Sequence, residues 1–142
     1  MVTGIDPSSG MLAQARARVR GDQLRMNLCR LAFSAGRFQG VWCMASLLRL
    51  PKAEAPDALG EMRRVLLPGG ALLLGLQEGE GEIWESAPYG TAERLFVRYT
   101  PGEAEALLNL AGFSVHERAA NDAGRRRWLQ FLATAPGVSR LS

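Results

Sequence analysis

The sequence predicts an α/β fold, with a mostly parallel β-sheet covered by helices on both faces and an antiparallel hairpin at its C-terminal end. Short apolar runs alternate with segments of helical period over most of the chain, which is the pattern that builds such sheets. The last two apolar runs are separated only by a turn, which indicates a hairpin. With 142 residues, of which 47% are hydrophobic and 22% charged, the chain has room for a single domain covering residues 1–142.

The first half of the chain is expected to contain three strands and two helices. A β-branched apolar run at the start stops at a proline and two serines, which indicates a strand, a turn and a capped helix. A near-continuous apolar run further on is typical of a strand covered on both faces. A segment with apolar residues at helical spacing then ends at a Pro-Gly-Gly sequence. The expected strands are Val2–Ile5, Leu24–Leu28 and Phe38–Ala45, and the expected helices run from Ser8 or Ser9 to about Arg20 and from about Pro56 to Leu67.

The second half begins with a strand expected at Ala71–Leu76, directly after Pro68-Gly69-Gly70. The stretch Gln77–Gly90 is rich in Gly and Glu and has no period, so it is expected to be a loop. Thr100–Glu103 matches a capping box with proline at the first helical position, which predicts a helix ending near Gly112. The expected hairpin consists of strands at Phe113–Arg118 and Arg127–Ala133 around a turn at Asn121–Gly124.

Composition excludes several classes of function. The net charge of +3 is too small and too dispersed to predict nucleic-acid binding, and the longest strongly apolar run, Ala71–Leu76, is too short to cross a membrane. Cys29 and Cys43 lack metal-type spacing and the chain has one histidine, so no metal site is expected. No charged-then-apolar leader opens the sequence, and we therefore expect a cytoplasmic protein with free thiols.

Open sheets of this kind bind ligands at the carboxyl ends of their strands, near the point where strand order reverses. The residues that follow the predicted strands are therefore the candidates for a binding site. They are Asp6, Asn27, Met44 to Arg49, and Gln77 to Trp84.

The chain resembles the class I S-adenosylmethionine-dependent methyltransferases, and most of all the small-molecule variety called methyltransferase type 11. The resemblance lies in four blocks, which read VTGIDPSSGMLAQARARV, RMNLCRLAF, FQGVWCMASLLRLP and ALGEMRRVLLPGGALLLGLQEGEGE. The tail RLFVRYTPGEAEALLNLAGFSVHE, followed by RRRWLQFLATAP, is similar to that family's last helix and hairpin. The resemblance implies a Rossmann-like three-layer sandwich with S-adenosyl-L-methionine as cofactor.

Asp6 is the residue to which the resemblance assigns most chemistry, because it implies that this carboxylate accepts hydrogen bonds from both ribose hydroxyls. Pro7 and Met11 would then lie near the adenine. The alternative is that Asp6 only begins a helix beside proline, where the helix dipole favours a negative charge.

Two further positions would complete the cofactor site. The resemblance places Asn27, where the family usually has Asp, and Leu28 at the adenine, and it places Met44 and Ala45 beside the methionine part. A neutral amide accepts a hydrogen bond less strongly than a carboxylate, so the substitution of Asn for Asp weakens this contact. The alternatives are a turn asparagine at Asn27 and ordinary strand packing at Met44.

Arg49 and Trp84 are the candidate substrate residues. Arg49 stands where relatives often carry His, and its permanent charge prevents it from acting as a general base, so it either binds an anionic substrate or faces solvent. Trp84 either lines a substrate mouth with neighbouring glutamates or belongs to a solvated loop. No residue is identified as catalytic, and the oligomeric state is left open.

The glycine-rich loop that follows the family's first strand is absent, because Met1 falls one residue before the family's second strand. In the family, the missing strand lies between those predicted here at Val2–Ile5 and Phe38–Ala45. These two strands must therefore either pair directly or leave their edges open. Three explanations remain: a start site recorded downstream of the true one, a truncated inactive gene, or a partner chain that supplies the missing element.

Three functions are consistent with the sequence. The first is a methyltransferase domain, N-terminally truncated as written, that acts on a small-molecule acceptor and neither nucleic acid nor membrane. The second is a non-catalytic remnant that keeps the layered core. The third is a nicotinamide-dependent oxidoreductase, because an Asp after a strand suits any ribose, although the RVLLPGG block and the terminal hairpin oppose it.

Overall fold

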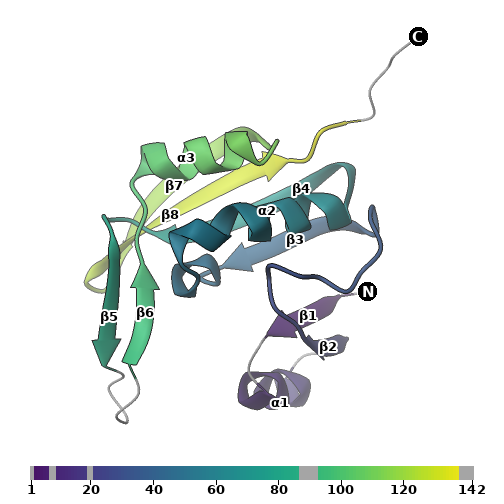
Figure 1. Ribbon diagram of the computed structural model, residues 1–142, viewed down its shortest axis with the longest axis horizontal. Helices are drawn as coiled ribbons and strands as arrows, with labels where there is room; N and C mark the ends of the chain where they lie inside the picture. The colour runs from purple at the N-terminus through teal and green to yellow at the C-terminus, as the bar shows by residue number, and fades with distance from the viewer. Residues whose placement is uncertain (1, 7–8, 19–20, 87–92, 138–142) are drawn as a thin grey trace.

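The N-terminal unit is a small parallel sheet with one helix. The structure, a computed structural model, describes residues 2–6, 9–18, 21–86 and 93–137, and leaves out the side chains of Asp6, Ser9, Leu12, Arg16 and Gln23. Strands β1 (Thr3–Asp6) and β2 (Asp22–Arg25) pair in parallel, and helix α1 (Ser9–Arg18) connects them. The predicted strand–helix–strand order is therefore present at the start of the chain (Figure 1).

The main sheet has four strands in the order β3-β4-β8-β7. Strand β3 (Phe38–Met44) is parallel to β4 (Leu66–Gln77), whereas β8 (Arg126–Thr134) is antiparallel to both of its neighbours, β4 and β7 (Ser114–Ala123). The mixed sheet with a C-terminal antiparallel hairpin confirms this part of the prediction. Its helices are α2 (Ala55–Val65) and α3 (Pro101–Leu110), with short 3₁₀ helices η1 (Leu47–Arg49) and η2 (Lys52–Glu54) before α2.

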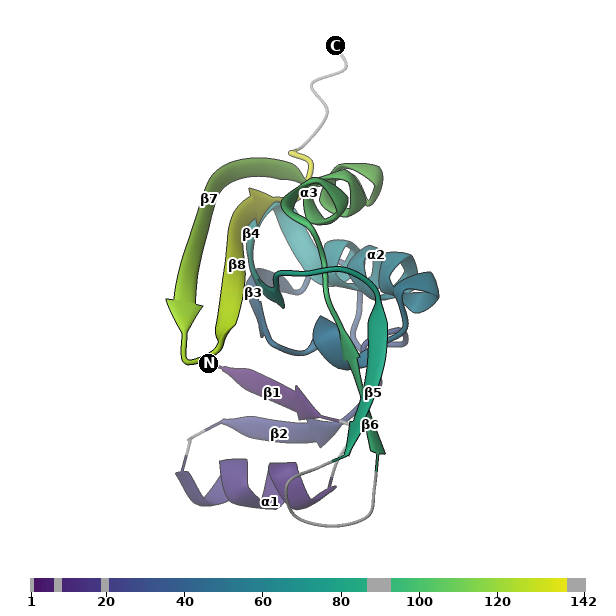
Figure 2. The same cartoon turned by 90° about the vertical axis from the view of Figure 1, so that its left-hand side faces the viewer.

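The hydrophobic core lies between this sheet and the two helices. Alternate side chains of β4 point to the same face, and Leu72, Leu74 and Leu76 are each fully buried there. They form one cluster with Leu59 and Met62 of α2, and with residues of α3 and β8 that include Ala104, Leu108, Phe131 and Ala133. Figure 2 shows α2 and α3 together on one side of the sheet.

The opposite face of the main sheet is less covered than predicted. Three residues are paired across neighbouring strands on this face: Trp42, Leu73 and Leu132. Each is next in sequence to residues whose side chains point into the core. Trp42 exposes 78% of its surface and Leu73 and Leu132 are half-buried. The prediction of helices on both faces of the sheet is therefore wrong for these four strands, because both α2 and α3 pack on the other face.

β1 and β3 leave an edge open toward each other. Within the described residues β1 pairs only with β2, and β3 pairs only with β4, so the two parallel units are separate sheets. Of the two outcomes expected for these strands, the structure shows open edges and not direct pairing among the described residues.

Several predicted boundaries are wrong, each for a local reason. β2 ends at Arg25 and not at Leu28, because the Asn27 side chain accepts a hydrogen bond from the Cys29 N–H at 2.8 Å and the Arg30 N–H donates to the Asn27 carbonyl. β4 begins at Leu66, before Pro68-Gly69-Gly70, because Leu66 pairs with Phe38. The register shifts between Phe38 and Gly40, and this irregularity accommodates the additional β4 residues between Leu66 and Ala71.

The predicted loop Gln77–Gly90 contains a strand, β5 (Glu82–Ser86), which pairs in antiparallel fashion with β6 (Glu93–Val97). Pairing with β6 stabilises β5 more than the composition of β5 itself does. The C-terminal hairpin is also longer than predicted, with strands reaching Ala123 and starting again at Arg126, and Gly124 takes the positive φ of 64° that the tight turn requires. The capping box is confirmed, since Thr100 and Glu103 exchange both expected hydrogen bonds.

Candidate functional site

A largely apolar cleft of about 780 Å³ lies between β1 and β3. Its volume falls in the range typical of small-molecule sites. The lining comes from β1, from the segment after β2, from both faces of β3, and from α2, β4 and β8. These residues are Val2, Thr3, Gly4, Ile5, Leu28, Leu31, Phe33, Phe38, Gly40, Val41, Trp42, Cys43, Met44, Ser46, Met62, Val65, Ala71, Leu73 and Leu132.

The wall formed by residues 31–33 is held to α2 by an ion pair. Glu61 accepts from the Leu31 N–H at 2.9 Å, and Arg64 donates to the carbonyls of Leu31 and Phe33, each at 2.8 Å. Arg64 also contacts Glu61 at 2.6 Å, and this hydrogen bond lowers the pKa of the Glu61 carboxyl. The backbone of this segment is therefore positioned by charged side chains that lie outside the cleft.

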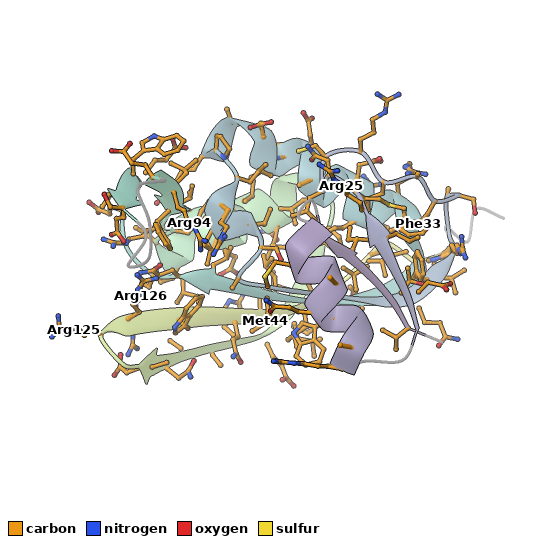
Figure 3. The ribbon with its side chains drawn as sticks, turned by 90° about the horizontal axis from the view of Figure 1, so that it is seen from below. Arg25, Phe33, Met44, Arg94, Arg125 and Arg126 are labelled. Atoms are coloured by element: carbon orange, nitrogen blue, oxygen red, sulfur yellow. The ribbon has the colours of Figure 1, made fainter. Side chains whose placement is uncertain are left out.

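The backbone turns sharply at the carboxyl end of β3. Ala45 is the one non-glycine residue of the described chain with a positive φ, at 61°, a conformation that costs energy and concentrates at functional sites. Its N–H donates to the Gly75 carbonyl at 3.1 Å, which fixes the turn against β4. Met44, directly before it, lines the cleft, and Figure 3 shows Met44 and Phe33 toward opposite ends of β3 with α1 in front.

Gly75 is required for the position of Met44. A Cβ atom added at Gly75 would lie 2.5 Å from Met44 Cε and 2.7 Å from Met44 Sδ, closer than such atoms approach in proteins. We predict that Gly75→Ala lowers the free energy of unfolding by about 1 kcal/mol, because the methionine must leave its place. Adding Met44→Ala should recover at least about 0.5 kcal/mol relative to the sum of the single changes, measured by urea unfolding.

Gly102→Ala is the matched control for this test, because a Cβ added at Gly102 has no heavy atom within 4 Å among the described residues. It should leave stability unchanged or raise it, since Gly102 lies in helix α3. Additive costs of the changes at Gly75 and Met44 would show that the two residues do not interact.

The predicted cofactor residues are only partly brought together. Leu28 and Met44 both line the cleft. Asp6 ends β1 at the edge of the cleft, but its side chain and all of Pro7 lie outside the described residues, so their predicted roles remain predictions. Met11 lies on α1 with 55% of its surface exposed, and it is not among the described lining residues.

Asn27 is exposed and forms the turn described above, with its Oδ1 accepting the Cys29 N–H. This contact supports the alternative in which Asn27 is a turn residue. A carbonyl oxygen has two lone pairs, so Oδ1 can accept one more hydrogen bond besides that from Cys29.

The two predicted substrate residues lie on neighbouring elements outside the cleft lining. Arg49 ends η1 and is exposed, and Trp84 lies in β5 with 64% of its surface exposed. The β5–β6 hairpin packs on η1 through β6. Both residues lie in segments that follow β3 and β4, no described contact joins them to the cleft, and their roles remain predictions.

Two buried polar groups lie near this region: Gln77, which was a candidate from its place after a predicted strand, and Tyr99, which sequence reasoning missed. Gln77 ends β4 and Tyr99 follows β6, and each exposes 3% of its surface. Neither Gln77 Oε1 nor the Tyr99 hydroxyl has a hydrogen-bond partner among the described residues. The Lys52 ammonium lies 4.9 Å from the centre of the Tyr99 ring. Only Gln77 has a signal in the sequence, as a polar residue at the end of an otherwise apolar strand.

Burial raises the pKa of Tyr99 to about 12, and the charges of Glu103 and Glu82 add to the shift. An unfolded tyrosine has a pKa of about 10, so deprotonation above that pH favours the unfolded chain. Stability contributed by Tyr99 is therefore lost as the pH rises from about 10 to about 12. We predict that wild type loses about 1.4 kcal/mol more than Tyr99→Phe between pH 8 and pH 11, measured by urea unfolding.

The same variant has an expected result at pH 7. Because the buried hydroxyl has no described partner, Tyr99→Phe should be as stable as wild type there, or more so. The two proteins serve as each other's control, because burial also raises the pKa of Cys43 to about 11 in both of them. If the free energies of unfolding of the two proteins changed in parallel above pH 10, the assignment of this pH dependence to Tyr99 would be contradicted.

Other chemistries find little support in the described part of the chain. Burial raises the pKa of both cysteine thiols, with Glu54, Asp57 and Glu61 adding to the effect at Cys29, so neither is an activated nucleophile. No cluster of three potential metal ligands occurs among the described residues. No described helix is long and apolar enough to span a membrane.

Comparison with protein families matches residues 1–74 to the methyltransferase domain family of type 11. This match covers more than half of the 142 residues. The chain therefore belongs to the class I S-adenosylmethionine-dependent methyltransferase family, as its sequence blocks predicted. A search of curated proteins found no match.

Solved structures confirm the fold. An S-adenosylmethionine-dependent methyltransferase from Methanosarcina mazei superposes with a TM-score of 0.83 at 21% identity, over 95% of this chain and 82% of that protein. The 1,6-didemethyltoxoflavin-N1-methyltransferase of Burkholderia thailandensis, solved with 1,6-didemethyltoxoflavin and S-adenosylhomocysteine, has a TM-score of 0.75 at 18% identity, over 94% of this chain and 60% of that one. The [4+2]-cyclase SpnF has a TM-score of 0.74 at 20% identity, with 95% and 66% covered.

The described cleft fits part of the family's cofactor. Its apolar lining suits a purine ring, and the hydroxyl groups among the described lining residues are those of Thr3 and Ser46. No described lining residue carries a charge for the amino acid end of the cofactor. The described lining residues therefore suit the adenine part.

Proposed function

We propose that this chain is an S-adenosylmethionine-dependent methyltransferase domain that acts on a small-molecule acceptor. The observation that carries the proposal is the position of Asp6 and Met44, which end β1 and β3 on either side of one cleft in a chain of this family. Ligands of open α/β sheets bind at such strand ends. The acceptor class is supported by the small molecule 1,6-didemethyltoxoflavin, which is bound by the Burkholderia enzyme, a fold relative.

Each residue has one role in this proposal. Asp6 accepts hydrogen bonds from the ribose hydroxyls, with Pro7 and Met11 near the adenine. Asn27 and Leu28 contact the adenine, and Met44 contacts the methionine part, held there by the close approach of Gly75. Arg49 and Trp84 select the acceptor from the adjoining η1 and β5 segments.

The cofactor, when bound, supplies an electrophilic methyl group on a sulfonium. The contribution of the protein is to hold the acceptor atom in line with that methyl group, and proximity and orientation alone supply several kcal/mol. A general base is needed only where the acceptor must lose a proton, and no described lining residue is suited to this task. The proposal therefore rests on positioning and not on acid–base chemistry.

A non-catalytic remnant of the fold is the second candidate, favoured by the open edges of β1 and β3. The [4+2]-cyclase SpnF, with the same fold, shows that the fold does not fix the reaction. A nicotinamide-dependent oxidoreductase is the third candidate, favoured only by the strand-terminal carboxylate.

Thermal unfolding with S-adenosylhomocysteine and with NADH distinguishes these functions. Ligand at about 100 times Kd stabilises a one-site protein by about 2.7 kcal/mol, which for a chain of this size is roughly 5–10 °C in Tm. The proposal predicts this rise with S-adenosylhomocysteine and none with NADH. A rise only after the gene is extended upstream of Met1 would favour a misplaced start, no rise in either form would favour the remnant, and preference for NADH would exclude the methyltransferase.

A further inference from the structure

Three arginines surround one carboxylate where the β5–β6 hairpin meets the start of β8. Arg98 lies 3.3 Å from Glu85 and Arg126 lies 3.7 Å from it, while Arg94 pairs with Glu85 in the strand register. The Arg126 guanidinium also lies 5.0 Å from the centre of the Phe96 ring. The three arginines are hereafter called the arginine cluster, and their positive charges exceed the single negative charge of Glu85.

The arginine cluster has more hydrogen-bond donors than its described partners use. A guanidinium carries several N–H donors, and a charge-assisted contact to a carboxylate is about 2.7–2.9 Å long at its best. Both contacts to Glu85 are longer than this. Among the described residues, the buried Arg98 Nε has no hydrogen-bond partner and Arg94 has no ion pair. Glu85 therefore satisfies the cluster only in part.

The arginine cluster adjoins the cleft on one face of the main sheet. Gln77 of β4 and Trp128 of β8 are register partners, and strand alternation places both on the sheet face of Met44. Arg126 shares this face, because it lies two residues before Trp128 in the same strand. Gln77 lies two residues, roughly 7 Å, beyond the register partner of Met44. Figure 3 shows Arg94 and Arg126 on the same side of Met44.

A buried polar side chain lies at the same junction. Gln77 exposes 3% of its surface, and its Oε1 has no hydrogen-bond partner among the described residues. The Tyr99 N–H donates to the Gln77 carbonyl at 3.0 Å, and the Glu78 N–H donates to the Arg127 carbonyl at 2.8 Å. These bonds fix the end of β4 between the segments that carry the arginine cluster. An unpaired buried acceptor costs free energy, and a ligand that supplies a donor removes this cost.

We propose that the arginine cluster binds a carboxylate of the methyl acceptor, and that Gln77 Oε1 accepts a hydrogen bond from the same molecule. Arginine matches the planar geometry of a carboxylate with two parallel N–H donors. Phe96 and the half-buried Trp128 provide aromatic surface for a flat ligand body on this face. The inference rests on the proposed function, because it assigns the carboxylate to the acceptor, and it deepens that function by making the acceptor an acid.

The test is a titration of the ligand-free protein with benzoate, with benzamide as the neutral analogue, at constant ionic strength. The nitrogen–proton NMR signal of the Trp128 indole reports binding, and Trp128→Phe identifies it among the three tryptophans. We expect saturable binding of benzoate, at least about tenfold tighter than that of benzamide. Equal binding of the two compounds, no binding of benzoate, or tighter binding of inorganic phosphate would overturn the proposal.

Two arginine variants locate the site. Arg126→Gln should weaken benzoate binding by about tenfold, because one of the charged donors is lost. Arg118→Gln is the matched control, since Arg118 also pairs with a glutamate, Glu105, but lies in β7 opposite Phe131 of the core face. It should leave benzoate affinity unchanged. Equal weakening by both substitutions would show an effect of net charge alone and would overturn the site.

A substitution at Gln77 tests the second contact. Gln77→Leu should leave the stability of the ligand-free chain unchanged or raise it, because the amide oxygen has no described partner to lose. Urea unfolding without ligand measures this. A less stable variant would show that Gln77 has a structural role and would overturn its assignment to the ligand.

S-adenosylhomocysteine separates this inference from the proposed function. Arg126→Gln should bind it as tightly as wild type, and weaker binding would assign the carboxylate to the cofactor and overturn the inference. Benzoate binding without S-adenosylhomocysteine binding would support the carboxylate site and remove the proposed function. S-adenosylhomocysteine binding without benzoate binding would keep the proposed function and overturn the site.

Discussion

Replacing Asp6 with asparagine is expected to weaken binding of S-adenosylhomocysteine by about 10–100-fold. A hydrogen bond to a charged group contributes about 1.5–3 kcal/mol, and every 1.4 kcal/mol is tenfold in affinity. Asn keeps the shape and one acceptor oxygen but loses the charge and the second oxygen, so it cannot accept from both ribose hydroxyls as Asp does. The measurement is a fluorescence titration of the tryptophans, with wild type and variant compared at the same salt concentration.

Asp22→Asn provides the matched control. Asp22 begins β2 and pairs in register with Thr3, at the amino end of the small parallel sheet, whereas Asp6 ends β1 at the carboxyl end. The same loss of charge there should leave affinity unchanged. Equal weakening by both substitutions would indicate a general effect of net charge, and no weakening by Asp6→Asn would remove Asp6 from the site.

Leu74→Ala should lower the free energy of unfolding by about 2–5 kcal/mol, the cost of a cavity in a well-packed core. Leu74 is fully buried in the strand between β3 and β8, with Cys43 and Phe131 as its register partners. A loss of this size is a large part of the 5–15 kcal/mol that stabilises a typical domain. Urea unfolding at pH 7 measures it.

The control for this change is the next residue in the same strand. Leu73 faces the opposite side of the sheet and is half-buried, so Leu73→Ala should cost less than half as much as Leu74→Ala. Equal costs would mean that both faces of the sheet are buried in solution. That result would place a covering element over Trp42 in the 142-residue chain itself.

The elements that sequence predicted well carry their own local signal. The Thr100–Glu103 capping box can be recognised in the sequence because its hydrogen bonds join residues three positions apart. β3 can be recognised because a run of apolar residues is needed to bury its core-facing side. β5 was missed because its stability comes from pairing with Glu93–Val97, which no local pattern in Glu82–Ser86 reveals. The coverage of the sheet was mistaken because the face on which a helix packs depends on connections between strands.

The candidate site was predictable to a similar extent. Met44 lines the cleft at the carboxyl end of β3, where the rule for parallel sheets places it, whereas Leu28 lines it from the segment after β2. The engagement of Asn27 with the Cys29 N–H, and the exposure of Met11, depend on turn and helix orientations that spacing does not determine. The close approach of Gly75 to Met44 likewise arises only from the register of β3 against β4.

Calorimetric titration with S-adenosylhomocysteine tests the proposed function most directly. It should be performed on the 142-residue chain and on the form extended ahead of Met1, with NADH titrated in parallel. The account predicts saturable one-site binding of S-adenosylhomocysteine, at least as tight in the extended form, and no binding of NADH. Absence of binding in both forms, or tighter binding of NADH, would contradict it.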